Sequence, residues 1–74
     1  MAIEHSWDSQ NGGGQSNIIL DPGTYVLENA TADDGLTGAM ITEGPAPFKL
    51  AARTLVTITT RRGRSTLREI VSDG

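Results

Sequence analysis

Few residues in this 74-residue chain have side chains that could bind a ligand or take part in a reaction. The only histidine, His5, lies two positions from the only tryptophan, Trp7. A histidine and a tryptophan side by side can stack on a base or a sugar. Three arginines, Arg61, Arg62 and Arg64, form the densest cluster of charge, and clustered arginines can bind phosphate groups. The sequence thus offers two candidate binding segments, one near each end of the chain.

The residue sets that enzymes and metal sites use are missing from the sequence. There is no cysteine, and acid-base chemistry would rest on carboxylates or Tyr25. The run Gly12-Gly13-Gly14 lacks the Gly-Lys-Ser/Thr of a phosphate-binding loop, and Asp33-Asp34-Gly35 lacks the further carboxylates of a calcium loop. We therefore expect no enzyme activity, no catalytic residue, no cofactor and no metal. The glycine run is predicted to be a linker, and Asp33-Asp34-Gly35 a turn.

The charges are divided between the two halves of the chain. The net charge is −3, but residues 1–48 contain seven carboxylates and no Lys or Arg, whereas residues 49–74 contain all six basic residues and two acidic ones. Such an asymmetry indicates an electrostatic partner. We predict that the arginines contact carboxylates of a neighbouring protein chain. Nucleic acid is the less expected partner, because no aromatic residue is interleaved among the arginines and the whole chain is acidic.

The order of polar and apolar segments predicts the elements that position these residues. Residues 1–16 are polar and glycine-rich without a period, so we predict a flexible N-terminal arm followed by a small β-domain at 17–74. Asp21-Pro22-Gly23 predicts a type II turn between two short strands. Arg61-Arg62-Gly63-Arg64 predicts a hairpin loop from which 65–71 returns antiparallel, with a short terminal helix as the alternative. Further strands are expected at 36–42 and 53–60.

Short strands separated by Gly and Pro turns predict an all-β fold, namely a small antiparallel β-sandwich or open barrel with a flexible N-terminal arm. A chain this short builds a thin core, and no disulfide can support it. Oligomerisation or docking onto a partner is the expected supplement. The predicted core consists of Ile18, Ile19, Leu20, Tyr25, Val26, Leu27, Leu36, Met40, Ile41, Phe48, Leu50, Leu55, Val56, Ile58, Leu67, Ile70 and Val71.

The arm contains the only tryptophan, ahead of three glycines. We predict that Ile3, His5 and Trp7 bind a partner, with Trp7 as the anchor that becomes ordered when the arm lies on another protein. In that case Trp7→Ala leaves the melting of the free domain nearly unchanged. The alternative is that the arm folds back over its own thin core, in which case the same substitution lowers the stability of the domain.

These segments resemble a known class of proteins. A polar arm with one tryptophan (HSWDSQNGGGQ), followed by a β-domain that opens NIILDPGTYVLENAT, is similar to the decoration or cement proteins on the capsids of tailed bacteriophages. The resemblance implies a virion protein that binds the major capsid protein. It also implies a symmetric homo-oligomer, with a trimer favoured, whose arms clamp neighbouring capsid subunits and which stabilises the shell.

The sequence therefore predicts a non-enzymatic structural protein that docks on and stabilises a larger assembly through Ile3, His5, Trp7, Arg61, Arg62 and Arg64. Its start has no signal-peptide pattern and no stretch is apolar enough to span a membrane, so we expect synthesis in the cytoplasm without secretion. Two other functions stay open. One is a small nucleic-acid-binding β-barrel that uses the Arg61–Arg64 hairpin, and the other is a small inhibitor or regulatory protein that binds one soluble target.

Overall fold

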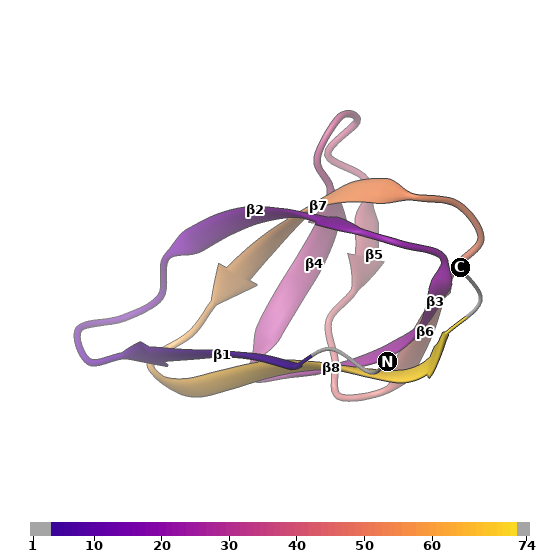
Figure 1. The fold of residues 1–74 in the computed structure, drawn as a ribbon. Helices are drawn as coiled ribbons and strands as arrows, with labels where there is room; N and C mark the ends of the chain where they lie inside the picture. Colours follow the sequence, from indigo (N-terminus) through magenta and orange to yellow (C-terminus); the bar gives the residue numbers. More distant parts are fainter. Residues whose placement is uncertain (1–3, 73–74) are drawn as a thin grey trace.

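The computed structural model describes residues 4–72, which form eight β-strands in two sheets (Figure 1). In chain order the strands are β1 (Glu4–Ser9), β2 (Gln15–Leu20), β3 (Gly23–Glu28), β4 (Ala30–Asp34), β5 (Met40–Thr42), β6 (Pro47–Leu50), β7 (Thr54–Thr60) and β8 (Gly63–Ser72). Sheet A has the strand order β1-β8-β3-β6, and sheet B has the order β2-β7-β4-β5. All neighbouring strands pair antiparallel.

The path of the chain between the sheets defines the fold. Every connection crosses from one sheet to the other, except the one between β4 and β5. This path and these two strand orders are those of a jelly roll, the sandwich built from two Greek keys. The prediction of a small antiparallel β-sandwich is therefore confirmed. The open barrel is not formed, because no strand of sheet A pairs with a strand of sheet B within residues 4–72.

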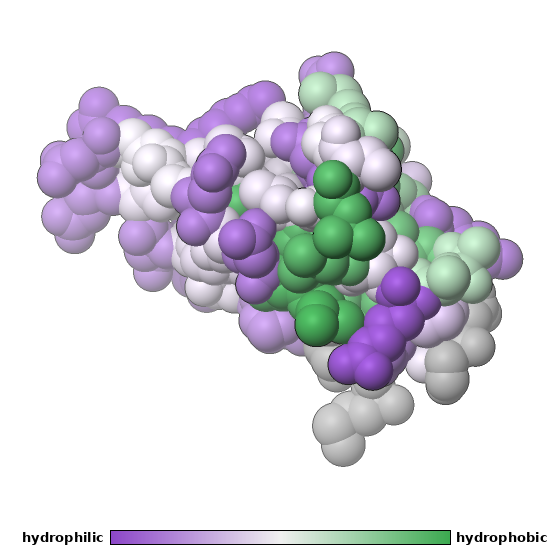
Figure 2. Space-filling view, turned by 90° about the horizontal axis from the view of Figure 1, so that it is seen from above, coloured by the Kyte–Doolittle hydropathy of each residue, from purple (hydrophilic) through white to green (hydrophobic). Residues whose placement is uncertain are grey.

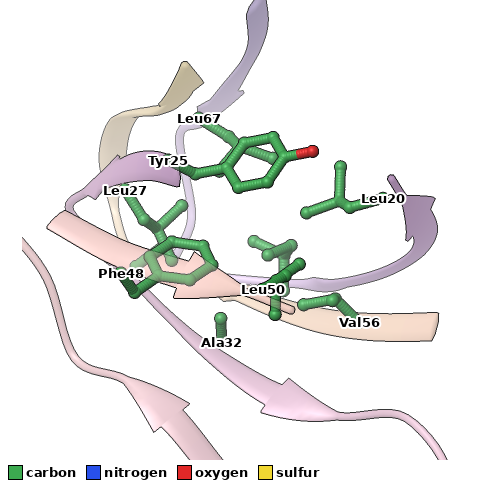
Figure 3. Packing of buried hydrophobic residues seen from close by; sticks show 10 residues of the cluster. Leu20, Tyr25, Leu27, Ala32, Phe48, Leu50, Val56 and Leu67 are labelled. Atoms are coloured by element: carbon green, nitrogen blue, oxygen red, sulfur yellow. The ribbon is translucent and has the colours of Figure 1, made fainter. Parts of the chain in front are cut away.

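The core lies between the sheets and is filled by alternate residues of the strands, since successive side chains of a strand point to opposite faces. In β7, Val56 and Ile58 are fully buried, while Leu55 between β-branched neighbours lies on the other face. Figure 3 shows the buried side chains of both sheets pointing toward one another, with the rings of Tyr25 and Phe48 stacked at a centroid distance of 5.7 Å. The buried apolar residues are Leu20, Tyr25, Leu27, Ala30, Ala32, Phe48, Leu50, Val56, Ile58 and Leu67.

Several predicted core residues lie on the surface instead. Ile19 is 58% exposed, because Ile18 and Leu20 on either side of it face inward. Leu36 is 85% exposed and Met40 is 60% exposed. Ile70 and Val71 are about half exposed, near the register shift of β8 against β3. A run of consecutive apolar residues cannot bury all its members in one strand, and the small side chains of β4 complete the core instead.

The described part of the predicted arm differs from the prediction. Residues 4–9 form β1, which pairs with β8 over six positions, and residues 15–16 already belong to β2. Between these strands, Gly13 lies so close to β7 that a Cβ there would overlap the carbonyl oxygen of Thr60. The Thr60 amide donates to the carbonyl of Gly14 at 2.8 Å, and the Gly14 amide donates to Thr60 Oγ1 at 3.0 Å. The glycine run is thus a packed connection between the sheets and not a linker.

Two of the predicted turns also differ in their geometry. Gly23 is not in the left-handed region that a type II turn requires, and it begins β3 in the other sheet from β2. A Cβ on Gly23 would lie 2.7 Å from the Val71 carbonyl oxygen, so close packing explains this glycine. The expected strand at 36–42 is reduced to β5, because Asp34 Oδ1 accepts hydrogen bonds from the amides of Leu36 and Thr37 and closes a turn. These bonds lower the pKa of the Asp34 carboxyl.

The predicted hairpin at 61–64 is wrong, although both of its flanking segments are strands. Gly63 has a positive φ of 103°, but the turn carries the chain from β7 in sheet B to β8 in sheet A. Val56 and Ile58 therefore never pair with Leu67, and they meet it across the core. The terminal segment is a strand, so the alternative of a short helix is wrong as well.

Tyr25 forms a buried polar contact at the end of sheet A where β3 begins. Its hydroxyl donates to the carbonyl oxygen of Asp21 at 2.6 Å. Burial, followed by the nearby charge of Glu69, raises the pKa of Tyr25 to about 12. The carboxylate itself is buried, and Glu69 stands directly opposite Tyr25 in the register of β3 with β8. Folding therefore favours the protonated phenol.

We expect Tyr25 to titrate near pH 12 in the folded protein and near its ordinary value of about 10 in urea. The folded pKa is higher than the unfolded pKa. The contribution of protonated Tyr25 to the free energy of unfolding is therefore complete below pH 10 and is lost as the pH rises from 10 to 12. Absorbance at 295 nm measures this directly, since the chain has one tyrosine. Tyr25→Phe is the control and should lack the absorbance change. A midpoint near pH 10 in the folded protein would contradict the buried contact.

Candidate functional site

The structure does not bring the predicted partner-binding residues to one place. Ile3 lies outside the described residues. His5 and Trp7 lie on β1 opposite Leu67 and Ser65 of β8, on the face of sheet A that points toward the core. Trp7 is half-buried and packs against the core, and its ring stacks with that of His5 at a centroid distance of 6.0 Å. Trp7 therefore supports its own domain, which is the fold-back alternative.

The arginine turn, defined as Arg61, Arg62 and Arg64, is held in place by Asn29. This residue joins β3 to β4 with a φ of 58°, a left-handed conformation that Asn adopts more readily than most residues. Its Nδ2 donates to the carbonyl oxygens of Arg62 and Arg64 at 3.1 and 3.2 Å. Its own carbonyl accepts from the Arg61 amide and from Ser65 Oγ. The backbone of the turn is thus fixed, while the three arginine side chains extend from an exposed segment.

Acidic residues of the same chain lie beside these basic ones on the outer face of sheet A. In the register of β1 with β8, Glu4 stands opposite Arg68 and Asp8 stands opposite Arg64. Directly opposite residues of antiparallel strands point to the same face, so each carboxylate shares a face with an arginine. A shallow groove of about 220 Å³ runs over this face, with Glu4, Glu28, Arg64 and Arg68 in its lining.

A second hollow, of about 490 Å³, adjoins the arginine turn. Arg61 and Arg64 line it together with Glu28 and Glu43. Two carboxylates from the first half of the chain therefore share this hollow with two arginines from the second half. The expected contact between these arginines and carboxylates of a neighbouring chain stays a prediction, but the structure provides carboxylates within the chain, so the arginine turn is not an isolated basic patch.

The outer face of sheet B has a different character. Ile19 on β2 stands opposite Leu55 on β7, and both side chains lie on this outer face. Gly35 packs on Leu55 and donates its amide to the Leu55 carbonyl at 2.7 Å, so the turn that carries Leu36 lies beside this pair. Met40 on β5 is exposed at the other edge of the sheet. Figure 2, which looks down on sheet B, shows hydrophobic side chains gathered in the middle of this face. We call Ile19, Leu36, Met40 and Leu55 the sheet B patch.

Sequence reasoning missed this patch because it assigned all four residues to the core. A signal was available in Ile18-Ile19-Leu20, where the strict alternation of a strand puts the middle residue on the opposite face from its neighbours. A second signal was Leu36, which directly follows the Asp33-Asp34-Gly35 turn sequence. An exposed apolar residue on a turn is available to a partner and does not contribute to the core.

No group of three or more His, Cys, Asp or Glu side chains lies close enough to hold a metal ion among residues 4–72. The same residues include no helix with the length and apolar character of a membrane span. Comparison with family models, curated proteins and solved structures gives no match. The fold and the two surfaces described above are therefore the basis for a functional proposal.

Proposed function

We propose that this protein is a non-enzymatic structural protein that docks on a larger protein assembly and helps to hold it together. The observation that supports this proposal most directly is the sheet B patch, in which Leu36 is 85% exposed and Ile19 is 58% exposed. Exposed apolar side chains gathered on one face of a small domain mark a surface that another protein covers. The resemblance to capsid decoration proteins suggests the assembly, a phage virion, and the partner, its major capsid protein.

The fold is compatible with this proposal but does not decide it. Jelly rolls occur in viral capsid proteins, and they occur equally in lectins and other unrelated proteins. The charge distribution is more informative. Glu28 and Glu43 lie in the same hollow as Arg61 and Arg64, which favours a protein partner over nucleic acid, since a nucleic-acid site presents basic groups without carboxylates among them.

The proposal is tested by binding of the purified chain to capsids of the source virus that lack it, followed by sedimentation. The chain should co-sediment up to a fixed number of copies per capsid. Leu36→Asp should weaken binding about tenfold or more, because it places a charge at the most exposed apolar residue of the proposed interface, a change on the order of 1.4 kcal/mol. The fold should be unaffected, because Leu36 is exposed in a turn.

Ala51→Asp is the matched control, because it introduces the same charge at an exposed position outside both the sheet B patch and the arginine turn. It should bind capsids as well as the unmodified chain does. If Leu36→Asp binds as tightly as the unmodified chain, the sheet B patch is not the docking surface. No binding to capsids, together with retention on DNA that weakens steeply with salt, would replace the structural proposal with the nucleic-acid one.

A further inference from the structure

The four edges of the two sheets differ in how they are protected from pairing with another strand. An edge strand exposes unpaired N–H and C=O groups, and proteins protect edges with short strands, bulges, prolines or charges. β5 has three residues and a register shift, and β6 begins at Pro47 and carries Lys49. β1 carries Glu4 and Asp8. Only the remaining edge, β2, has none of these features.

β2 is a regular and uncharged strand. Its sequence QSNIIL contains no charged residue, proline or glycine, and its register with β7 is continuous from Gln15 opposite Thr59 to Leu20 opposite Thr54. Within residues 4–72 it pairs only with β7. Its odd-numbered residues, Gln15, Asn17 and Ile19, are all exposed. The strand therefore presents a straight, accessible edge of six residues.

The hydrogen bonds of the neighbouring residues show which backbone groups of β2 are free. The Thr60 amide donates to the carbonyl of Gly14, so this opposed pair is hydrogen-bonded. In an antiparallel ladder, hydrogen-bonded pairs alternate with pairs whose backbone groups point away. The even-numbered residues of β2 therefore bond to β7. Gln15, Asn17 and Ile19 direct their N–H and C=O groups toward the open edge.

We propose that β2 pairs antiparallel with β2 of a second copy of this chain across a two-fold axis. This pairing joins the two copies of sheet B into one continuous eight-stranded sheet. With the axis at Asn17, Gln15 and Ile19 of one copy stand opposite Ile19 and Gln15 of the other. Antiparallel pairing in this register keeps the outer faces of the two sheets on the same side. The free backbone groups of Gln15, Asn17 and Ile19 then find partners in the second copy.

The charge distribution favours a second copy as the occupant of this edge. Each chain has a net charge of −3, so two copies repel wherever their acidic groups approach. Along β2 they do not approach, because the outward-facing residues of β2 and of β7 beside it are all uncharged: Gln15, Asn17, Ile19, Leu55, Thr57 and Thr59. An uncharged strand edge can therefore pair with its own copy across a two-fold axis, in an isologous interface, without repulsion between charges.

The pairing is independent of the proposed docking function but is compatible with it. It uses the edge of sheet B and leaves the outer face open, so the two sheet B patches face the same side of the dimer. Each copy then contacts the assembly through its own sheet B patch. The pairing of one edge with itself closes at two copies, whereas the resemblance to decoration proteins implies a trimer. The oligomer number therefore separates the two expectations.

The test is the mass of the chain in solution, measured by analytical ultracentrifugation over a range of concentrations. The unmodified chain should show twice its monomer mass of 7.8 kDa at high concentration. Asn17→Pro removes an edge N–H without removing a bond to β7, and it should weaken dimerisation at least tenfold. Asn17→Ala is the matched control, because it also loses the hydrogen bond from Thr57 Oγ1 to Asn17 Oδ1 but keeps the N–H, and it should stay dimeric.

Circular dichroism shows whether each variant is folded, and Asn17→Lys replaces the proline variant if that one does not fold. Hydrogen exchange gives a second readout, because the amides of Gln15, Asn17 and Ile19 should become protected as the concentration rises. Monomers at all concentrations, a trimer, or an Asn17→Pro dimer as stable as that of Asn17→Ala would each overturn the pairing. Protection of these amides only when a different protein is added would assign the edge to a foreign strand.

Discussion

Gly13→Ala is expected to destabilise the domain by about 3 kcal/mol, a cost typical of forcing extra atoms into a packed site. A Cβ at this position would overlap the carbonyl oxygen of Thr60. That carbonyl is backbone at the end of β7, in a residue that is itself buried and bonded to Gly14. It cannot turn aside as a flexible side chain would. A chain of this length has a total stability of roughly 4–11 kcal/mol, so the loss is large.

Gly14→Ala is the matched control for this prediction. Nothing lies within 4 Å of a Cβ at Gly14, and its φ is not positive, so the substitution should change the stability by less than about 1 kcal/mol. Urea unfolding followed by circular dichroism measures both variants. Equal unfolding midpoints for Gly13→Ala and Gly14→Ala would show that the segment is the flexible linker that its composition suggests, and that the close contact with Thr60 does not form.

The comparison of these two glycines illustrates which features the sequence could predict. The strand at 53–60 was predictable because its β-branched residues favour extended backbone wherever the strand is placed. Sandwich architecture followed from several such segments. The need for glycine at position 13 was not predictable, because it comes from Thr60, which lies far away in the sequence.

Strand pairing was the main feature that local chemistry could not provide. Arg61-Arg62-Gly63-Arg64 has the composition of a hairpin loop, and Gly63 does adopt a positive φ. The turn nevertheless connects two sheets, because β7 pairs with β2 and β4 while β8 pairs with β1 and β3. These partner strands are distant in the sequence from residues 61–64, so the residues around the turn do not reveal them. The difficulty of placing Val56, Ile58 and Leu67 on one face in a hairpin was a signal that the two strands do not pair.

In the candidate site, too, local features were predictable and the contacts with distant strands were not. The unusual residues of the sequence, Trp7 and the arginine turn, were recognised, but their surroundings were not. β1 was taken for a flexible arm because it is an edge strand whose outward-facing residues are polar, so its composition resembles that of a linker. The sheet B patch was taken for core, because hydropathy does not distinguish an apolar residue that faces inward from one that faces outward. Both errors concern the direction of side chains in strands whose neighbours were unknown.

Trp7→Ala is expected to lower the stability of the isolated domain by about 2–3 kcal/mol and its melting temperature by roughly 10–20 °C. The indole packs against the core from β1, opposite the small side chain of Ser65. Its removal leaves the side of the sandwich at β1 without a large apolar group. The estimate is below the usual loss for a tryptophan in a core, because the side chain is half-buried.

His5→Ala is the control, since His5 stacks on Trp7 but is exposed, and it should cost less than about 1 kcal/mol. Thermal unfolding of the free protein is measured by circular dichroism, because Trp7→Ala removes the fluorescent residue. An unchanged melting temperature for Trp7→Ala would contradict the packing of β1 and would favour the sequence-based prediction, in which Trp7 anchors an arm to a partner. If the domain is destabilised as expected, weaker binding of this variant to an assembly follows from unfolding, because the tryptophan already has its contacts within its own chain.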